Sequence, residues 1–89
     1  MNSIIPNNLK GVCYICGRWG ETEVHHMIHG SNRRNADHYG LTVHLCHRCH
    51  RELHDHGTHD RELQRIAQQE FEKQWGRKEW MKVFQKSYL

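Results

Sequence analysis

The sequence contains no apolar run long enough to cross a membrane, since no stretch approaches the ~20 apolar residues of a spanning helix. Residues 1–10 also lack the charged start and following apolar run of a signal peptide. No internal repeat and no low-complexity segment interrupts the chain. These absences predict a protein without a membrane partner, located in a reducing cytoplasm.

Apolar residues are also scarce, because only 36% of the 89 residues are hydrophobic. A chain of this length is expected to form a single domain, residues 1–89. Such a small domain buries a limited part of its surface, and a bound metal is one usual way to compensate. The formal net charge of +3 is mildly basic. It is consistent with a nucleic-acid partner without requiring one.

The four cysteines form two Cys-x-x-Cys pairs, Cys13 with Cys16 and Cys46 with Cys49. In a reducing compartment this spacing is typical of one closed tetrahedral zinc. We therefore predict a structural Zn²⁺ that clamps the first pair onto the second. Two disulfides are one alternative, and a catalytic or redox role for the thiols is another.

All ten histidines lie between His25 and His59, which indicates a site and not a general bias in composition. His25 and His26 are adjacent on a predicted strand, so they should point to opposite faces. His50 and His54 lie one helical turn apart and can reach one metal ion. A histidine-rich polar surface and a second structural zinc are the alternatives.

The pattern of apolar and turn residues predicts an α+β fold. Residues 1–10 are expected to form a flexible arm, followed by a zinc knuckle at 12–17. Strands at 23–28 and 41–45 should form an antiparallel hairpin around a polar loop, residues 29–40.

Helices are predicted for the second half of the chain. The first should begin near Cys49, end near Asp55 and stop at Gly57. A tail, residues 58–89, should contain two helices separated by Gly76, with Thr58 or Asp60 as the first cap. The three tryptophans are expected in the core: Trp19, Trp75 and Trp80.

Two segments, Glu23–Ile28 and Leu45–His50, resemble those of HNH endonucleases. The resemblance covers residues 13–54 and extends to small HNH proteins of phages and prophages, in which a Gly-Ser/Ala-Asn-Arg loop follows a His-His pair. It implies a ββα-metal (His-Me finger) core at residues 11–56, here with a four-cysteine structural zinc, followed by the two-helix tail. It also implies an enzyme that hydrolyses DNA phosphodiester bonds with a divalent ion, Mg²⁺, Mn²⁺, Ni²⁺ or Zn²⁺.

The same resemblance assigns roles to individual histidines. His26 corresponds to the general base, which takes a proton from the attacking water. His25, His50 and His54 correspond to ligands of the catalytic metal, with His59 as an alternative to His54.

The chain departs from the family pattern at Leu41, where the motif has an asparagine that braces the loop and orients the base. A leucine side chain cannot form that hydrogen bond. Three polar residues are candidates to replace it: Asn35, Asp37 and His44.

Four arginines are candidate phosphate contacts, and each is otherwise an ordinary solvated side chain: Arg33, Arg34, Arg48 and Arg51. The chain has no helix-turn-helix signal and no strongly basic helix, so the expectation is cleavage of low sequence specificity or cleavage directed by a partner or by DNA structure. The phage resemblance implies a bacterial host cytoplasm and partners in packaging or recombination. One alternative function is a non-catalytic zinc module that binds DNA or protein on a degenerate HNH fold. Another is a small phage regulatory protein whose nuclease-like fold presents a binding surface.

Overall fold

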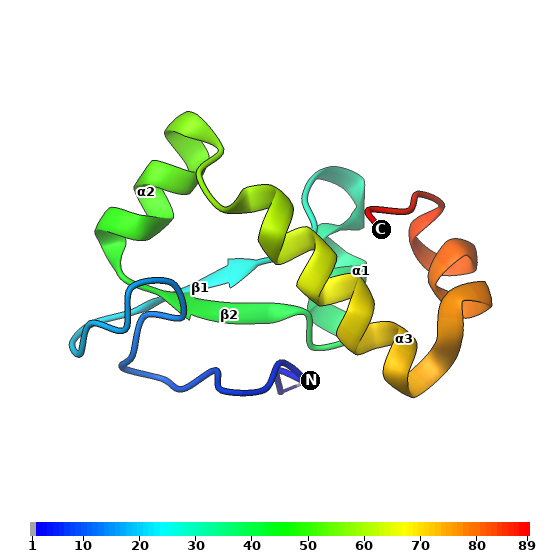
Figure 1. Cartoon of the computed structure of the whole chain (residues 1–89), viewed down its shortest axis with the longest axis horizontal. Coiled ribbons are helices and arrows are strands. Elements are labelled where there is room, and N and C mark those ends of the chain that lie inside the picture. The colour runs from blue at the N-terminus through cyan, green and yellow to red at the C-terminus, as the bar shows by residue number, and fades with distance from the viewer. Residues whose placement is uncertain (1) are drawn as a thin grey trace.

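The computed structural model describes residues 2–89 and contains one two-stranded sheet with helices around it (Figure 1). The fold is α+β, as the sequence predicts. Its elements in chain order are β1 (Glu23–His26), the 3₁₀ turn η1 (Gly30–Asn32), α1 (Arg33–His38), β2 (Thr42–Leu45), α2 (His47–His56) and α3 (Asp60–Phe84).

The two strands form an antiparallel hairpin in which His25 lies opposite Val43 and His26 opposite Thr42. Side chains alternate between the two faces of a strand, so His25 is buried while Val24 remains exposed. Both strands are shorter than the sequence predicts, at four residues each. Their alternation nevertheless separates His25 from His26, as expected.

The connection between the strands is more ordered than the predicted polar loop. It contains η1 and α1, and Ala36 of α1 is fully buried. Two asparagine side chains tie it to the far end of α3, since Asn32 donates to the carbonyl of Phe84 and Asn35 to that of Val83. A six-residue helix is too short to produce a clear apolar periodicity, which is why the sequence pattern missed it.

The N-terminal arm, expected to be flexible, is packed along β2 in the structure (Figure 1). The Ser3 hydroxyl donates to the carbonyl of Thr42 at 2.6 Å, and the side-chain oxygen of Asn8 accepts from the backbone N–H of His44 at 2.8 Å. Gly40 allows this approach, because a Cβ on its backbone would collide with the carbonyl oxygen of Asn2. Gly40 also has a φ of 73°, which favours glycine.

Helix α2 begins at His47, two residues earlier than predicted, with the Cys46 sulfur accepting from the backbone N–H of Cys49. It ends at Gly57, whose φ of 71° confirms the predicted stop.

Gly76 divides α3 into two helical segments, because its φ of 84° and ψ of 166° are not helical, and this confirms the predicted break. Neither predicted residue caps α3. The N-cap is His59, which makes no side-chain capping bond, and Asp60 is the first helical residue.

One apolar core joins the hairpin, α2 and α3. Phe71 and Trp80 are fully buried and contact edge to face, with ring centroids 5.3 Å apart. The prediction for Trp19 is wrong, because this side chain is 79% exposed on the knuckle. Within the described residues, no helix is long and apolar enough to cross a membrane.

Candidate metal sites

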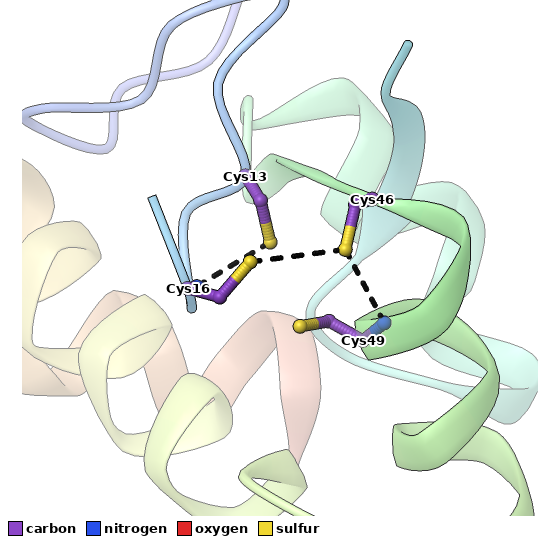
Figure 2. A group of neighbouring side chains, drawn as sticks. All are labelled: Cys13, Cys16, Cys46 and Cys49. Carbon is purple, nitrogen blue, oxygen red and sulfur yellow. Dashed lines mark hydrogen bonds between the residues drawn. The ribbon is translucent and has the colours of Figure 1, made fainter. Parts of the chain in front are cut away.

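The four cysteines converge from the knuckle and from the β2–α2 junction, as the sequence predicts (Figure 2). All four sulfurs lie within 4.8 Å of one another. The sulfurs of Cys16 and Cys46 are 3.9 Å apart. Zinc–sulfur bonds of about 2.3 Å place tetrahedral ligands about 3.8 Å from each other. The group therefore has the spacing to bind a zinc ion.

Electrostatics also favour a cation between these sulfurs. Burial raises the pKa of the Cys13 thiol, but backbone N–H groups, that of Cys16 foremost, lower it further, to about 6. Burial and hydrogen bonds with the neighbouring sulfurs raise the pKa of Cys49 to about 12. One thiol thus ionises readily, whereas Cys49 resists ionisation chiefly because burial penalises its charged form. A divalent cation bound to the sulfurs favours the thiolate form of each cysteine.

A second group consists of histidines from β1 and α2. His25, His50 and His54 each offer a ring nitrogen, and these nitrogens all lie within 4.8 Å of one another. The Nε2 atoms of His50 and His54 are 3.1 Å apart. Tetrahedral zinc–nitrogen bonds of about 2.0–2.1 Å separate ligand atoms by about 3.3 Å. The alignment of i and i+4 residues on α2 thus brings two imidazoles to one point beside the strand.

His25 lies at the centre of this group and is only 2% exposed. Its Nε2 is the one buried side-chain nitrogen or oxygen of residues 2–89 that has no hydrogen-bond partner. Burial, followed by the neighbouring His29, His50 and His54, lowers its pKa to about 3. His25 is therefore a neutral imidazole at pH 7, and a buried unpaired nitrogen is costly unless a ligand occupies it. Its chemistry fits a metal ligand.

Glu23 orients His50 from two residues before His25. Its carboxylate oxygens lie 2.8 Å from Nδ1 of His50 and 3.2 Å from Nδ1 of His47. A carboxylate only accepts hydrogen bonds, so Nδ1 of His50 carries a proton, and in the neutral ring the lone pair is on Nε2. This carboxylate–histidine arrangement is the usual support of a metal-binding imidazole. The sequence interpretation missed Glu23.

His26 lies on the other face of β1, 18% exposed in its side chain, and contacts Asp37 of α1. The two atoms are His26 Nε2 and Asp37 Oδ1, 3.2 Å apart. Of the three candidates to replace the motif asparagine, Asp37 is the one that contacts His26. Asn35 bonds to Asn32 and the end of α3, and His44 pairs with Thr22.

The Leu41 side chain is fully buried, and the backbone of Leu41 forms the hydrogen bonds that hold this loop. Its N–H donates to the carbonyl of Ala36 at 2.8 Å, and its carbonyl accepts from Met27 at 3.0 Å. The turn after α1 is thus held to the end of β1 without an asparagine side chain.

The four predicted arginines do not gather at one place. Arg33 lines the same cleft, of about 280 Å³, as His25, His50 and His54. Arg34 lies with Arg33 and His26 in an adjoining hollow. Arg48 instead lies in a separate hollow beside Cys49. Arg51 forms an ion pair with Asp55.

His59, the alternative third ligand, also lies away from the histidine group. It shares the hollow of Arg48 and pairs with Glu62. His54 is therefore the residue that the fold brings to His25 and His50. A residue that the sequence interpretation passed over, His29, lines the histidine cleft instead and contacts Asp60.

Comparison of the chain with protein-family models, curated proteins and solved structures gives no match. The assignment of function therefore rests on the motifs and on the geometry of the two sites.

Proposed function

We propose that the protein is an HNH-type endonuclease that uses a divalent ion to hydrolyse DNA phosphodiester bonds. The observation that carries this proposal is the buried, unpartnered Nε2 of His25 within reach of His50 and His54. Next to it, His26 has a carboxylate partner and stays outside the group of three. One set of imidazoles is thus available to bind metal and one imidazole is available for proton transfer.

In this proposal His25, His50 and His54 hold the ion, while the four cysteines hold a structural zinc. When bound, the divalent ion supplies positive charge to the scissile phosphate and to the 3′ leaving oxygen. The hairpin and α2 would then be the ββα-metal core, residues 11–56. The knuckle would attach to this core through the structural zinc.

His26 is the proposed general base. Because Asp37 accepts from its Nε2–H, the lone pair of the neutral ring is on Nδ1. Nδ1 takes the proton of a water molecule as the water oxygen attacks the phosphorus atom. The bond from phosphorus to the 3′ oxygen then breaks, and this oxygen leaves with a proton from solvent. An imidazole has the pKa for such a transfer near pH 7.

Arg33 is the best candidate for a phosphate contact, because it lines both the histidine cleft and the hollow beside His26. Arg34 extends the positive charge along the outer face of α1. Arg48 and Arg51 lie outside the histidine cleft, so they could contact only DNA that extends beyond the cleavage site.

The second candidate function is a zinc module that binds DNA or protein without cleaving it. Leu41 favours this candidate, because the side chain that braces the loop and orients the base in the family is lost. The contact between Asp37 and His26 favours the enzyme, since it supplies an alternative way to orient the base.

Nicking of supercoiled plasmid tests the proposal. The protein is incubated with plasmid DNA in the presence of Mg²⁺, Mn²⁺, Ni²⁺ or Zn²⁺, and in parallel with a chelator too weak to remove the structural zinc. We expect nicked circles only where a divalent ion is supplied. DNA binding with no nicking under any of the four metals would instead support the binding module.

Replacement of Asp37 by Asn tests the orientation of the base. The amide no longer holds His26 in one tautomer, so we expect the cleavage rate to fall about tenfold, which is less than the roughly 10²-fold or larger loss expected when the base itself is removed. Metal affinity should stay at the wild-type value, because Asp37 is outside the group of three. The pH dependence of the rate is the second measurement, since a merely structural role for Asp37 would not change the apparent pKa of the base. Asp55→Asn serves as the control, because it removes the same negative charge at an exposed position on α2.

A further inference from the structure

His29 and Asp60 form a pair at the edge of the histidine cleft, and nothing in the proposed function uses it. His29 lies in the turn between β1 and η1, whereas Asp60 is the first residue of α3. Their side chains meet with His29 Nε2 and Asp60 Oδ1 2.6 Å apart. Gln64 approaches the second oxygen of Asp60 at 3.5 Å. The carboxylate is therefore held on one side by α3 and points to His29 on the other.

His29 and Asp60 lie close to His25, the residue that also lies close to His50 and His54 of α2. His25, His29 and Asp60 each offer a ligand atom, and these atoms all lie within 4.8 Å of one another. The rings of His25 and His29 have centroids 5.3 Å apart, and those of His29 and His54 are 6.1 Å apart. His25 thus belongs to two sets of potential ligands, one from α2 and one from the start of α3.

The two sets share His25 alone, so an ion common to both must bind at His25. The lone pair of one imidazole nitrogen binds one metal ion, and Nε2 is the buried atom of His25 that lacks a partner. Asp60 accepts from Nε2–H of His29, so the free lone pair of His29 is on Nδ1. An imidazole whose second nitrogen donates to a carboxylate is the usual form of a metal ligand.

We propose that His29, oriented by Asp60, is a fourth protein ligand of the ion held by His25, His50 and His54. The inference rests on the metal site of the proposed function and extends it, because it makes the start of α3 part of that site. Four imidazoles favour nitrogen-preferring ions over Mg²⁺, which prefers oxygen ligands, and an ion that accepts five or six ligands, such as Ni²⁺ or Co²⁺, keeps positions open for the phosphate. The site is therefore expected to select its metal through His29.

The test measures binding of Co²⁺ and Ni²⁺ to the full chain, with the cysteine site already loaded with zinc. Titration calorimetry gives the affinity, and the visible spectrum of bound Co²⁺ reports its coordination. We expect His29→Ala and Asp60→Asn each to weaken binding about 10- to 100-fold, and His29→Ala to change the Co²⁺ spectrum. Glu62→Gln removes the same charge as Asp60→Asn from the same turn of α3, and it should bind both metals like the wild type.

Thermal unfolding with and without Ni²⁺ separates this role from simple attachment of α3 to the turn. A structural ion pair would lower the thermal midpoint equally with and without Ni²⁺, whereas a ligand would reduce the increase in midpoint that Ni²⁺ produces. If His29→Ala does not fold, Asp60→Asn alone decides. Wild-type affinity and spectrum in both variants would overturn the inference. If, in that case, His25→Ala still lost metal binding, the metal site of the proposed function would stand and only the role of His29 would be refuted.

Discussion

Replacement of Cys46 by Ser is expected to abolish zinc binding at the proposed four-cysteine site and to unfold the protein at ordinary temperatures. Cys46 is a buried member of the sulfur group, and its sulfur also accepts from the N–H of Cys49 at the start of α2. Binding of zinc to such sites is worth about 10–16 kcal/mol in small zinc domains, more than the net stability of many small folds. The free energy of unfolding should therefore fall by about 4 kcal/mol or more.

Two measurements check this prediction. Thermal unfolding followed by circular dichroism gives the stability. The near-ultraviolet absorption of Co²⁺ bound to sulfur reports the cysteine site separately, because histidine ligands do not produce it. Cys13→Ser should behave in the same way, whereas His56→Ala, an exposed change on α2, should leave both signals unchanged. A Cys46→Ser protein that keeps its zinc and its wild-type midpoint would contradict a structural role.

Replacement of His26 by Ala is expected to abolish cleavage and to leave metal binding intact. General base catalysis contributes about 10²- to 10⁴-fold to a rate, so the nicking rate should fall by about that factor. The side chain contacts Asp37 and lies outside the group of His25, His50 and His54, so its loss creates no gap in that group. His25→Ala should behave differently, because it removes the buried ligand and with it the ion.

The comparison of these two histidine variants separates the roles of adjacent residues. Nicking and Ni²⁺ affinity are measured on the same preparations, with His56→Ala as the control. Loss of Ni²⁺ binding in His26→Ala would make His26 a ligand and would refute the division of labour between the two. Full cleavage by His26→Ala would remove the proposed base altogether.

The members of the two ligand groups could be predicted from the sequence because the residues within each pair are separated by only a few positions. A Cys-x-x-Cys turn brings two sulfurs together wherever it occurs, and His50 and His54 share a face of any helix that includes both. Alternation along a strand likewise separates His25 from His26. The structure brings the four cysteines and the three histidines together as expected, while their binding of metal remains a prediction.

The failures of sequence interpretation involve short or irregular segments. Helix α1 has too few residues for a periodic pattern, and its one buried residue, Ala36, gives little signal. The packed arm depends on hydrogen bonds to β2, 36 and 39 residues away in the chain, which no local pattern encodes. Residue type predicts Trp19 in the core, but this residue lies just after the knuckle and is exposed.

By itself, the sequence determined which atoms are available for metal binding and which of them lie next to each other on one element. Only the tertiary structure decided how those atoms are supported. The contact of Asp37 with His26 spans 11 residues, that of Glu23 with His50 spans 27, and that of Asp60 with His29 spans 31. Each joins two different elements, so its existence depends on how those elements pack. For this reason only the tertiary structure shows the carboxylate partners of the three histidines, whereas the spacing of residues in the sequence is enough to predict the ligands.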